Sequence, residues 1–320
     1  MTADSTSLDV HLVSVLVPIS ERHDDLRRLF YAHSKVLDSL NIQYEFIFVL
    51  DGDFGEAEKC IRALKQEKPD QIQLIKFSRW QGEAKALSAA FSQSSGELIL
   101  TLSAYFQVEP EEIAKLFESF NDDIDVVFGS RFPRQDKWVN RLQSKIFHWI
   151  ISSFTKEPFN DISCGVRLIR RNVLEKISLY GDLHRFIPLL AINKGFNVKE
   201  ISLQQAKEDF HLRIYRPGVY VRRLLDILTL FFLIKFTQKP LRFFGLLGGG
   251  ISLLGLIISA VTLYQRLFSS IGLSERPLFL VGVLLALIGL QTFFIGLVGE
   301  IIIFTHMTSD PDYKIEVIID

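Results

Sequence analysis

The sequence has few cysteines and little net charge. Its 320 residues include only Cys60 and Cys164, which make neither a disulfide framework nor a metal-ligand cluster. We expect two reduced thiols, as in a domain exposed to the cytosol. The formal net charge is -1, whereas a nucleic-acid-binding protein usually has a strong excess of lysine and arginine. Nucleic acid is therefore not an expected partner.

Two common nucleotide-binding motifs are also absent. The sequence contains no GxGxxG and no GxxxxGK[ST], which counts against dinucleotide-dependent oxidoreductases and P-loop NTPases. We expect no organic cofactor. Residues 1–12, MTADSTSLDVHL, have no basic region followed by an apolar run, so no signal peptide is expected. The length alone predicts about two domains.

Long apolar runs are concentrated near the C-terminus. Residues 243–263 and 278–300 are free of charge up to Glu300, and each has about the 20 residues needed to cross a bilayer. The segment before them carries a series of basic residues: Arg213, Arg216, Arg222, Arg223, Lys235, Lys239 and Arg242. The loop between them has only Arg266 and Arg276. The positive-inside bias predicts that the N-terminal domain of this multi-pass protein faces the cytoplasm. We expect the protein in the inner (cytoplasmic) membrane.

A shorter apolar segment, interrupted by charged side chains, precedes these runs. We predict an amphipathic helix that lies in the membrane interface over residues 218–241, and a buried helix of the soluble domain is the alternative. The resulting organisation is a soluble domain over 1–217, the interfacial region over 218–241 and a transmembrane hairpin over 242–320. Gly248, Gly249 and Gly250 predict close packing of the two spans. Glu300 is predicted to anchor the second span at the interface.

Apolar strands alternate with helices in the N-terminal part. Strands are predicted at 12–19, 44–50, 72–77 and 98–102, with helices at about 24–40, 55–67 and 82–92. This alternation predicts an α/β fold with a doubly wound, mainly parallel sheet. Ligands of such sheets bind beyond the carboxyl ends of the strands. The residues at those positions are the site candidates: Pro18, Ser20, Glu21, Asp51, Asp53, Arg79, Gly82, Ser103, Tyr105 and Gln107.

Two of these positions suit particular parts of a nucleotide. Asp51 follows a strand, where its carboxylate can accept hydrogen bonds from a base or a ribose hydroxyl. A turn role is an equal alternative, because Asp-Gly is a frequent turn pair. Gly82 begins a predicted helix, and Arg79 and Lys85 lie nearby, which suits a diphosphate. An ordinary amphipathic helix with a solvated lysine is the equal alternative.

The order of several segments resembles a known family. VSVLVPISER, FVLDGD, SRWQGEAKALSAAF, LTLSAYFQVEPEEI, VVFGSRF and FNDISCGVRLIRRNVLEKI follow one another as in the family 2 glycosyltransferases of the A-type, Rossmann-like fold. The branch that fits resembles dolichyl-phosphate mannose synthase and bacterial polyprenyl-phosphate glycosyltransferases. Members of that branch often end in a membrane hairpin, so the resemblance covers nearly the whole chain.

The resemblance implies roles for residues that match its motifs. Pro18 and Glu21 would lie beside the nucleotide, and Asp51 would contact its base. Gln107 matches the glutamine after the Asp-Ala-Asp motif of the family. The remaining matches are Gly82, Lys85, Arg131, Asp161, Gly165, Arg167, Arg213 and Tyr220. We assign Arg131, Asp161, Gln107 and Arg213 to catalysis. The acceptor phosphate is assigned to His184, Arg185, Arg216 and Tyr220, and a packed helix is the alternative for the first two.

The sequence departs from the family at the metal motif. Ser103 and Tyr105 replace the two aspartates that would hold Mg²⁺ or Mn²⁺. Neither side chain substitutes for a carboxylate on such a hard cation. The metal ligands therefore stay unknown, with Asp51, Asp53 and Asp161 as remaining carboxylates. We hypothesise that cationic side chains take over part of the role of the metal, among them Arg79, Lys85, Arg131, Arg134, Arg185, Arg213 and Arg216. For most of these, a solvated surface residue is the alternative.

The resemblance predicts an enzyme that moves one sugar from a nucleotide-sugar to a polyprenyl phosphate, with inversion at the anomeric carbon. The expected partners are these two substrates and the membrane. A homo-oligomer is compatible with the small number of spans. The alternative function is a non-catalytic homologue that binds or assembles another membrane enzyme. Ser103 and Tyr105 are the residues that favour this alternative.

Overall fold

The computed structural model describes residues 12–132, 159–177, 179, 183–209, 225, 228–229, 240–269 and 277–306. The chain divides into two compact units. The first contains Met1–Ile227 together with Tyr313–Asp320, and the second is Leu228–Asp312. Most of the segment 218–241, predicted to lie in the membrane interface, falls outside the described residues.

The first unit is built on a seven-stranded sheet with the order β3-β2-β1-β4-β6-β5-β7. All neighbouring strands are parallel except that β6 runs antiparallel to β4 and β5. The strands are β1 (Val13–Ile19), β2 (Tyr44–Leu50), β3 (Ile72–Lys76), β4 (Leu98–Thr101), β5 (Val126–Arg131), β6 (Arg167–Arg170) and β7 (Val198–Leu203). The predicted α/β fold with a mainly parallel sheet is confirmed, and so are its first four strands.

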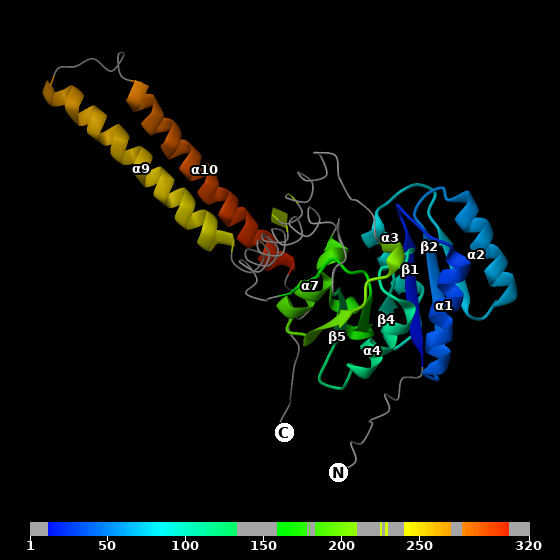
Figure 1. Ribbon diagram of the computed structural model, residues 1–320. Coiled ribbons are helices and arrows are strands. Elements are labelled where there is room, and N and C mark those ends of the chain that lie inside the picture. The colour runs from blue at the N-terminus through cyan, green and yellow to red at the C-terminus, as the bar shows by residue number, and fades with distance from the viewer. Residues whose placement is uncertain are drawn as a thin grey trace, which may run out of the picture. The chain divides into compact units, whose positions relative to one another are not determined.

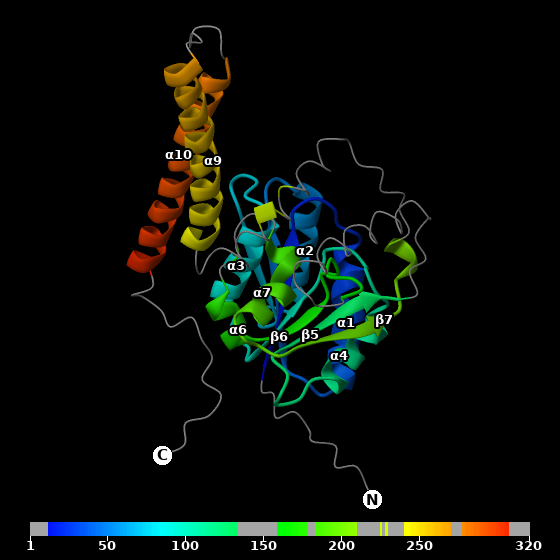
Figure 2. The ribbon, with the colours of Figure 1, turned by 90° about the vertical axis from the view of Figure 1, so that its left-hand side faces the viewer.

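Helices cover both faces of this sheet (Figures 1 and 2). One core cluster joins the sheet to α1 (Leu26–Ser39), α2 (Gly55–Glu67) and α4 (Ala114–Glu118). The other joins it to α3 (Glu83–Gln93), α6 (Arg171–Lys176) and α7 (Ile187–Asn193). Every residue of β1 and β2 is buried, as expected for strands covered on both faces. Three short 3₁₀ helices complete the described part: η1 (Pro110–Ile113), η2 (Leu183–Phe186) and η3 (Lys207–Asp209).

The strand order creates a switch point between β1 and β4. From β1 the chain adds β2 and then β3 toward one edge, and it returns to place β4 on the other side of β1. Both neighbours of β1 are parallel to it. In open α/β sheets, ligands bind beyond the carboxyl ends of the strands at such a point. The fold thus brings the residues that follow these two strands to the usual ligand position.

The second unit consists of two long apolar helices that lie side by side, α9 (Pro240–Ser269) and α10 (Pro277–His306) (Figure 1). Their segments Pro240–Gln265 and Pro277–Ile303 are long and apolar enough to cross a membrane. Large apolar side chains such as Leu246 and Leu267 are exposed on them rather than buried in a protein core. The prediction of two apolar helices is confirmed.

Glycines bring α9 and α10 into close contact. A Cβ added to Gly248 would lie 2.5 Å from the backbone N of Phe293, and one added to Gly255 would lie 2.3 Å from that of Ala286. Gly289 approaches the backbone N of Ser252 equally closely, at 2.3 Å. The prediction is wrong for Gly249 and Gly250, where an added Cβ meets no described atom within 4 Å. These two positions lie on other faces of α9, because successive residues of a helix point in different directions.

Glu300 connects the ends of the two helices. Its Oε2 accepts a hydrogen bond from the backbone N–H of Leu241 at 3.3 Å. Leu241 lies in the first turn of α9, where backbone N–H groups have no partner within the helix. A carboxylate at this position also interacts favourably with the positive end of the helix dipole.

Candidate active site

The end of β2 and the start of α3 are joined by Asp51. Its carboxylate accepts hydrogen bonds from the backbone N–H groups of Gln81 (2.6 Å) and Gly82 (2.9 Å). Asp51 is only 1% exposed. Gly82 has a φ of 97° and caps α3, so a glycine is required to make this turn. Asp51 thus has a turn role in the structure, but the turn that it holds contains Gly82, 31 residues later in the chain.

The neighbouring donor candidates are mostly solvent-exposed. Asp53 and Arg79 are exposed, and the Lys76 ammonium lies 4.0 Å from the Asp53 carboxylate. Lys85 is also exposed and donates a hydrogen bond to Gln81 Oε1 at 3.0 Å. At the end of β1, Pro18 is buried within the strand and Glu21 is exposed in the loop that follows. Exposed side chains beside a buried, fixed turn are suited to contact a ligand from solvent.

Asp24 fixes the turn at the end of β4, which contains Ser103 and Tyr105. Its backbone N–H donates to Ala104 O at 2.9 Å, and its Oδ2 accepts from the Phe106 N–H at 3.2 Å. Arg22 donates from Nη2 to Asp24 Oδ1 at 3.1 Å, and its guanidinium lies 4.5 Å from the centre of the Tyr105 ring. The loops after β1 and β4 therefore meet at the switch point.

Gln107 connects this turn to the loop before β6. Its Nε2 donates to the Tyr105 hydroxyl at 2.8 Å, and its Oε1 accepts from the Gly165 N–H at 2.7 Å. Gly165 O in turn accepts from Thr101 Oγ1 at 2.7 Å. A Cβ on Gly165 would lie 2.6 Å from Ser103 Oγ, so only glycine allows this close approach.

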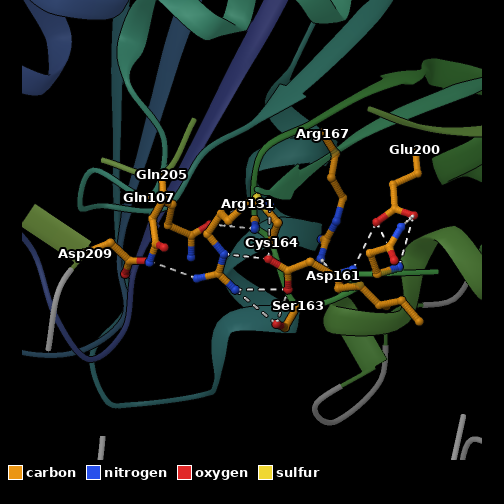
Figure 3. A network of polar contacts seen from close by, with 12 residues as sticks. Gln107, Arg131, Asp161, Ser163, Cys164, Arg167, Glu200, Gln205 and Asp209 are labelled. Atoms are coloured by element: carbon orange, nitrogen blue, oxygen red, sulfur yellow. Dashed lines mark hydrogen bonds and ion pairs between the residues drawn. The ribbon is translucent and has the colours of Figure 1, made fainter. Parts of the chain in front are cut away.

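Arg131, at the end of β5, is the centre of a buried ion-pair network (Figure 3). Its Nε and Nη2 donate to the two oxygens of Asp161 at 2.6 and 3.1 Å, and its Nη1 donates to Asp209 Oδ2 at 3.0 Å. Nη2 also donates to Ser163 Oγ at 3.2 Å. Burial acts to lower the pKa of the guanidinium, but the charges of Asp161 and Asp209 and the hydrogen bonds raise that pKa well above its usual value. Arg131 is 4% exposed and holds three segments together.

The loop that carries Asp161 is also held from β7. Glu200 accepts hydrogen bonds from the backbone N–H groups of Asn160 and Asp161, each at 3.0 Å (Figure 3). In the same loop, burial raises the pKa of the Cys164 thiol to about 11. The Cys164 side chain is therefore a neutral thiol at physiological pH and not a thiolate nucleophile.

Arg167 and His184 form a second polar group beside the start of α3. Arg167 Nη1 donates to His184 O at 2.9 Å, and burial lowers the pKa of this guanidinium. His184 Nε2 lies 3.2 Å from Glu83 Oε2. Burial acts to raise the pKa of Glu83, but its interaction with His184 and the positive charges of Arg185 and Arg167 hold that pKa below its ordinary value. Arg185 is half-buried next to this group.

The structure unites many predicted residues and adds others. Gln107 contacts Tyr105 and Gly165, Arg131 pairs with Asp161, and Cys164 joins the two groups through its thiol to Gln107 and its backbone N–H to Asp161 O. Sequence reasoning missed Arg22, Asp24, Glu200 and Asp209, although Arg22 and Asp24 follow β1 as directly as Glu21 does. No local signal points to Glu200 or Asp209, which act through partners far away in sequence. The predicted residues Arg134, Arg213, Arg216 and Tyr220 lie outside the described residues.

Of the three carboxylates that the sequence left as metal ligands, Asp51 and Asp161 are engaged within the protein and Asp53 is exposed. The carboxylate oxygens of Asp51 bind backbone N–H groups, and those of Asp161 bind Arg131. Asp24, the carboxylate next to the Ser103–Tyr105 turn, is bound through both oxygens to Arg22 and Phe106 N. Within the described ranges there is no group of three or more histidine, cysteine, aspartate or glutamate side chains able to hold a metal.

The sheet order and its covering helices define an A-type glycosyltransferase fold. Glucosyl-3-phosphoglycerate synthase from Mycobacterium tuberculosis, solved with Mn²⁺ and UDP, aligns with a TM-score of 0.51 over 68% of this chain and 80% of that chain. At 14% sequence identity this likeness shows the fold alone. The family description that matches residues 14–178 is glycosyl transferase family 2, and the chain belongs to that family. The predicted family is confirmed, and the protein is a glycosyltransferase.

Two curated relatives align over nearly the whole chain. Undecaprenyl-phosphate 4-deoxy-4-formamido-L-arabinose transferase from Proteus mirabilis (strain HI4320) is 28% identical over 98% of this chain and 96% of its own length. The transferase of the same name from Enterobacter sp. (strain 638) is 29% identical over 96% of this chain and 93% of its own length. The alignments thus include both the sheet and the two apolar helices.

Proposed function

We propose that this glycosyltransferase moves one sugar from a nucleotide-sugar to a polyprenyl phosphate at a membrane surface. The observation that carries the proposal is the alignment with undecaprenyl-phosphate sugar transferases over 98% of the chain. A lipid acceptor is consistent with the two apolar helices, which are long enough to cross a membrane. The basic segment before α9 supports an arrangement in which residues 1–217 face the cytoplasm, 218–241 lie in the interface and 242–320 form a hairpin.

The proposed donor site lies at the switch point of the sheet. Asp51 holds the turn before α3, so that Gly82 and Lys85 face the diphosphate and Asp51 lies near the base. Pro18, Glu21, Asp53 and Arg79 complete the donor side, with Ser103 and Tyr105 beneath the sugar. This assignment is supported by the hydrogen bonds of Asp51, which fix the N-terminus of α3 where a phosphate would bind.

The proposed reaction needs little proton transfer. The acceptor phosphate is ionised near neutral pH, so its oxygen attacks the anomeric carbon without a strong general base. The bond to the nucleoside diphosphate breaks on the opposite face of the sugar, which inverts the configuration. The protein must align the two substrates and stabilise the charge on the leaving diphosphate. We assign alignment to Gln107, Asp161 and Arg131, whose contacts join the ends of β4, β5 and the loop before β6.

The acceptor phosphate is proposed to lie near Arg213, Arg216 and Tyr220, with His184 and Arg185 as further contacts. Arg167 and Arg185 support this assignment, because their positive charges, which also lower the pKa of Glu83, lie in this region. Mn²⁺ is present in the structural neighbour named above, whereas the described residues of this chain contain no group of three or more candidate metal ligands. The proposal therefore derives no step from a metal.

The test is a transfer assay with the full chain in detergent, a short-chain polyprenyl phosphate and a panel of radiolabelled nucleotide-sugars. We expect lipid-linked label from one donor. Gln107→Ala should reduce it strongly, because it disconnects Tyr105 from Gly165. Arg62→Ala, an exposed residue of α2, is the matched control and should keep full activity. Transfer from none of the donors by protein shown to be folded would contradict the proposal and favour a non-catalytic role.

A further inference from the structure

Arg22 lies at the switch point of the sheet, beside Tyr105. It follows β1, the strand at the switch point, and its guanidinium lies over the Tyr105 ring, which follows β4. Tyr105 stands where the family motif has the second metal-binding aspartate. The chain therefore has a positive charge next to the position at which the family places a carboxylate and a cation.

The Arg22 guanidinium is held in place by hydrogen bonds that engage only some of its N–H donors. Nη2 donates to Asp24 Oδ1 at 3.1 Å and to Glu208 O at 3.2 Å, which accounts for both of its hydrogens. A guanidinium has five N–H donors. Within the described part of the chain, no atom accepts a hydrogen bond from Nε or Nη1 of Arg22. The Arg22 side chain is 31% exposed, and three of its N–H donors are left without an acceptor in that part of the chain.

These contacts select against a metal and in favour of an anion. A divalent cation beside Tyr105 would be repelled by Arg22 and would find no free carboxylate in Asp24. A diphosphate would instead gain a positive charge and several directed donors, which is the geometry for which arginine is suited. Ser103 and Tyr105, which replace the metal-binding aspartates, thus leave Arg22 beside a site for the diphosphate. The charge of that diphosphate is the one that a metal would have neutralised.

We propose that Arg22, positioned by Asp24 and the Tyr105 ring, binds the diphosphate of the donor and that the enzyme binds its nucleotide without a divalent metal. The inference rests on the proposed function for the identity of the donor, but it can be tested without transfer. In the reaction, the bond between the anomeric carbon and the diphosphate oxygen breaks, and Arg22 stabilises the electron pair that remains on that oxygen.

Arg28 provides a matched control. Its guanidinium lies 4.8 Å from the centre of the Phe106 ring, and its Nη1 donates to Glu208 Oε1 at 2.8 Å. Arg28 therefore also lies beside a ring and hydrogen-bonds Glu208, but it binds the Glu208 carboxylate, whereas Arg22 binds the Glu208 backbone oxygen. Arg28 differs from Arg22 in its position. It lies on α1 next to Phe106, whereas Arg22 lies over Tyr105, the residue that replaces an aspartate of the family motif.

The experiment is a calorimetric titration of the full chain in detergent with UDP, GDP, CDP and dTDP, in EDTA and again in Mn²⁺. Wild-type protein should bind one of these probes with affinities in the two conditions that agree within about threefold. Arg22→Ala should weaken binding in EDTA by about tenfold or more, since it removes charge-assisted hydrogen bonds. Arg22→Lys should recover part of the loss, and Arg28→Ala should match wild type.

A gain-of-metal variant makes the test sharper. Arg22→Ala with Ser103→Asp and Tyr105→Asp should bind the probe only with Mn²⁺, seen also as protein-bound Mn²⁺ by electron paramagnetic resonance. The inference is overturned if wild-type binding needs Mn²⁺ or if none of the probes binds in EDTA. The wild-type comparison requires no substitution, so misfolding of a variant does not affect it. If the protein binds a probe without metal but transfers no sugar to lipid, this inference stands and the proposed lipid acceptor is rejected. If sugar is transferred to lipid only with metal, the proposed function stands and this inference is rejected.

Discussion

Arg131 and Asp161 form a buried bidentate ion pair, with Nε and Nη2 of the arginine at 2.6 and 3.1 Å from the two carboxylate oxygens. The pair joins the end of β5 to the loop that precedes β6, across 30 residues of sequence. Asp209 adds a second negative charge to the same guanidinium. Each member of this group therefore depends on the others for compensation of its charge.

Replacing Arg131 by alanine should destabilise the first unit strongly. The substitution leaves Asp161 and Asp209 buried without their cation, which typically costs about 3–5 kcal/mol. The free energy of unfolding is measured by chemical denaturation of the full chain in detergent, followed by circular dichroism. Arg62→Ala, which removes a surface ion pair with Glu58, should leave the free energy of unfolding nearly unchanged. Equal losses in the free energy of unfolding for the two variants would show that the buried ion pair stabilises the protein no more than the exposed one.

Gly165→Ala should impair activity through a clash with Ser103. The added Cβ would lie 2.6 Å from Ser103 Oγ, so the turn after β4 and the loop before β6 must separate. We expect a loss in kcat/KM of about tenfold or more, equivalent to about 1.4 kcal/mol. The double variant Gly165→Ala/Ser103→Ala removes the clashing hydroxyl and should recover part of the rate. Gly55→Ala is the control, because its Cβ meets no described atom within 4 Å.

His33 should make stability depend on pH. It is buried on α1, stacks on Phe106, and its Nδ1 donates to Leu29 O at 2.7 Å. Burial lowers its pKa from 6.5 to about 4. The unfolded chain therefore binds more protons between pH 6.5 and 4, and stability falls by about 3 kcal/mol as the pH is lowered through that range.

The check for this effect is a pH series of unfolding curves for the wild type and for His33→Phe. The phenylalanine keeps the ring stack but does not titrate. We expect the stability of the wild type to decrease more steeply than that of the variant between pH 6.5 and pH 4. Parallel curves would mean that His33 is already charged in the folded protein.

Bulk on the glycine face of α9 should separate the two apolar helices. A side chain at Gly255 would meet the backbone N of Ala286 at 2.3 Å, whereas one at Gly249 meets no described atom within 4 Å. Gly255→Val should therefore lower the temperature at which the protein aggregates in detergent, and Gly249→Val should not. Size-exclusion chromatography after heating measures the fraction that stays soluble. If both variants aggregate at a lower temperature, the cause is the lower helix propensity of valine and not the loss of packing between α9 and α10.

The strands were predictable because their signal is local. Residues 44–50 are an apolar run that ends at the Asp51-Gly52 turn, and β2 has those bounds. The role of Asp51 was only half predictable, since the turn partner Gly82 is supplied by a loop 31 residues later. Position after a strand also identified Tyr105 and Gln107 as parts of the site, but it gave no information on which residues they contact.

The contacts that organise the site could not be read from local patterns. Arg131 and Asp209 are 78 residues apart, and no spacing rule connects a strand end to a short 3₁₀ helix at that distance. Arg22 was overlooked because a single arginine after a strand resembles many solvated arginines. Its significance appears only when the Tyr105 ring lies beside it. Long-range pairing of side chains, rather than secondary structure, is what the sequence alone did not reveal.

The glycines between α9 and α10 also limit how this hairpin can evolve. Gly282, Gly289 and Gly296 recur every seven residues on α10 and oppose Ser259, Ser252 and Phe244 of α9. Side chains on the remaining faces are exposed and apolar, so leucine, isoleucine, valine and phenylalanine can replace one another there at small cost. Among related sequences, the glycine positions should therefore stay fixed while the surrounding apolar residues drift, and this contrast would identify the helix pair even where overall similarity is low.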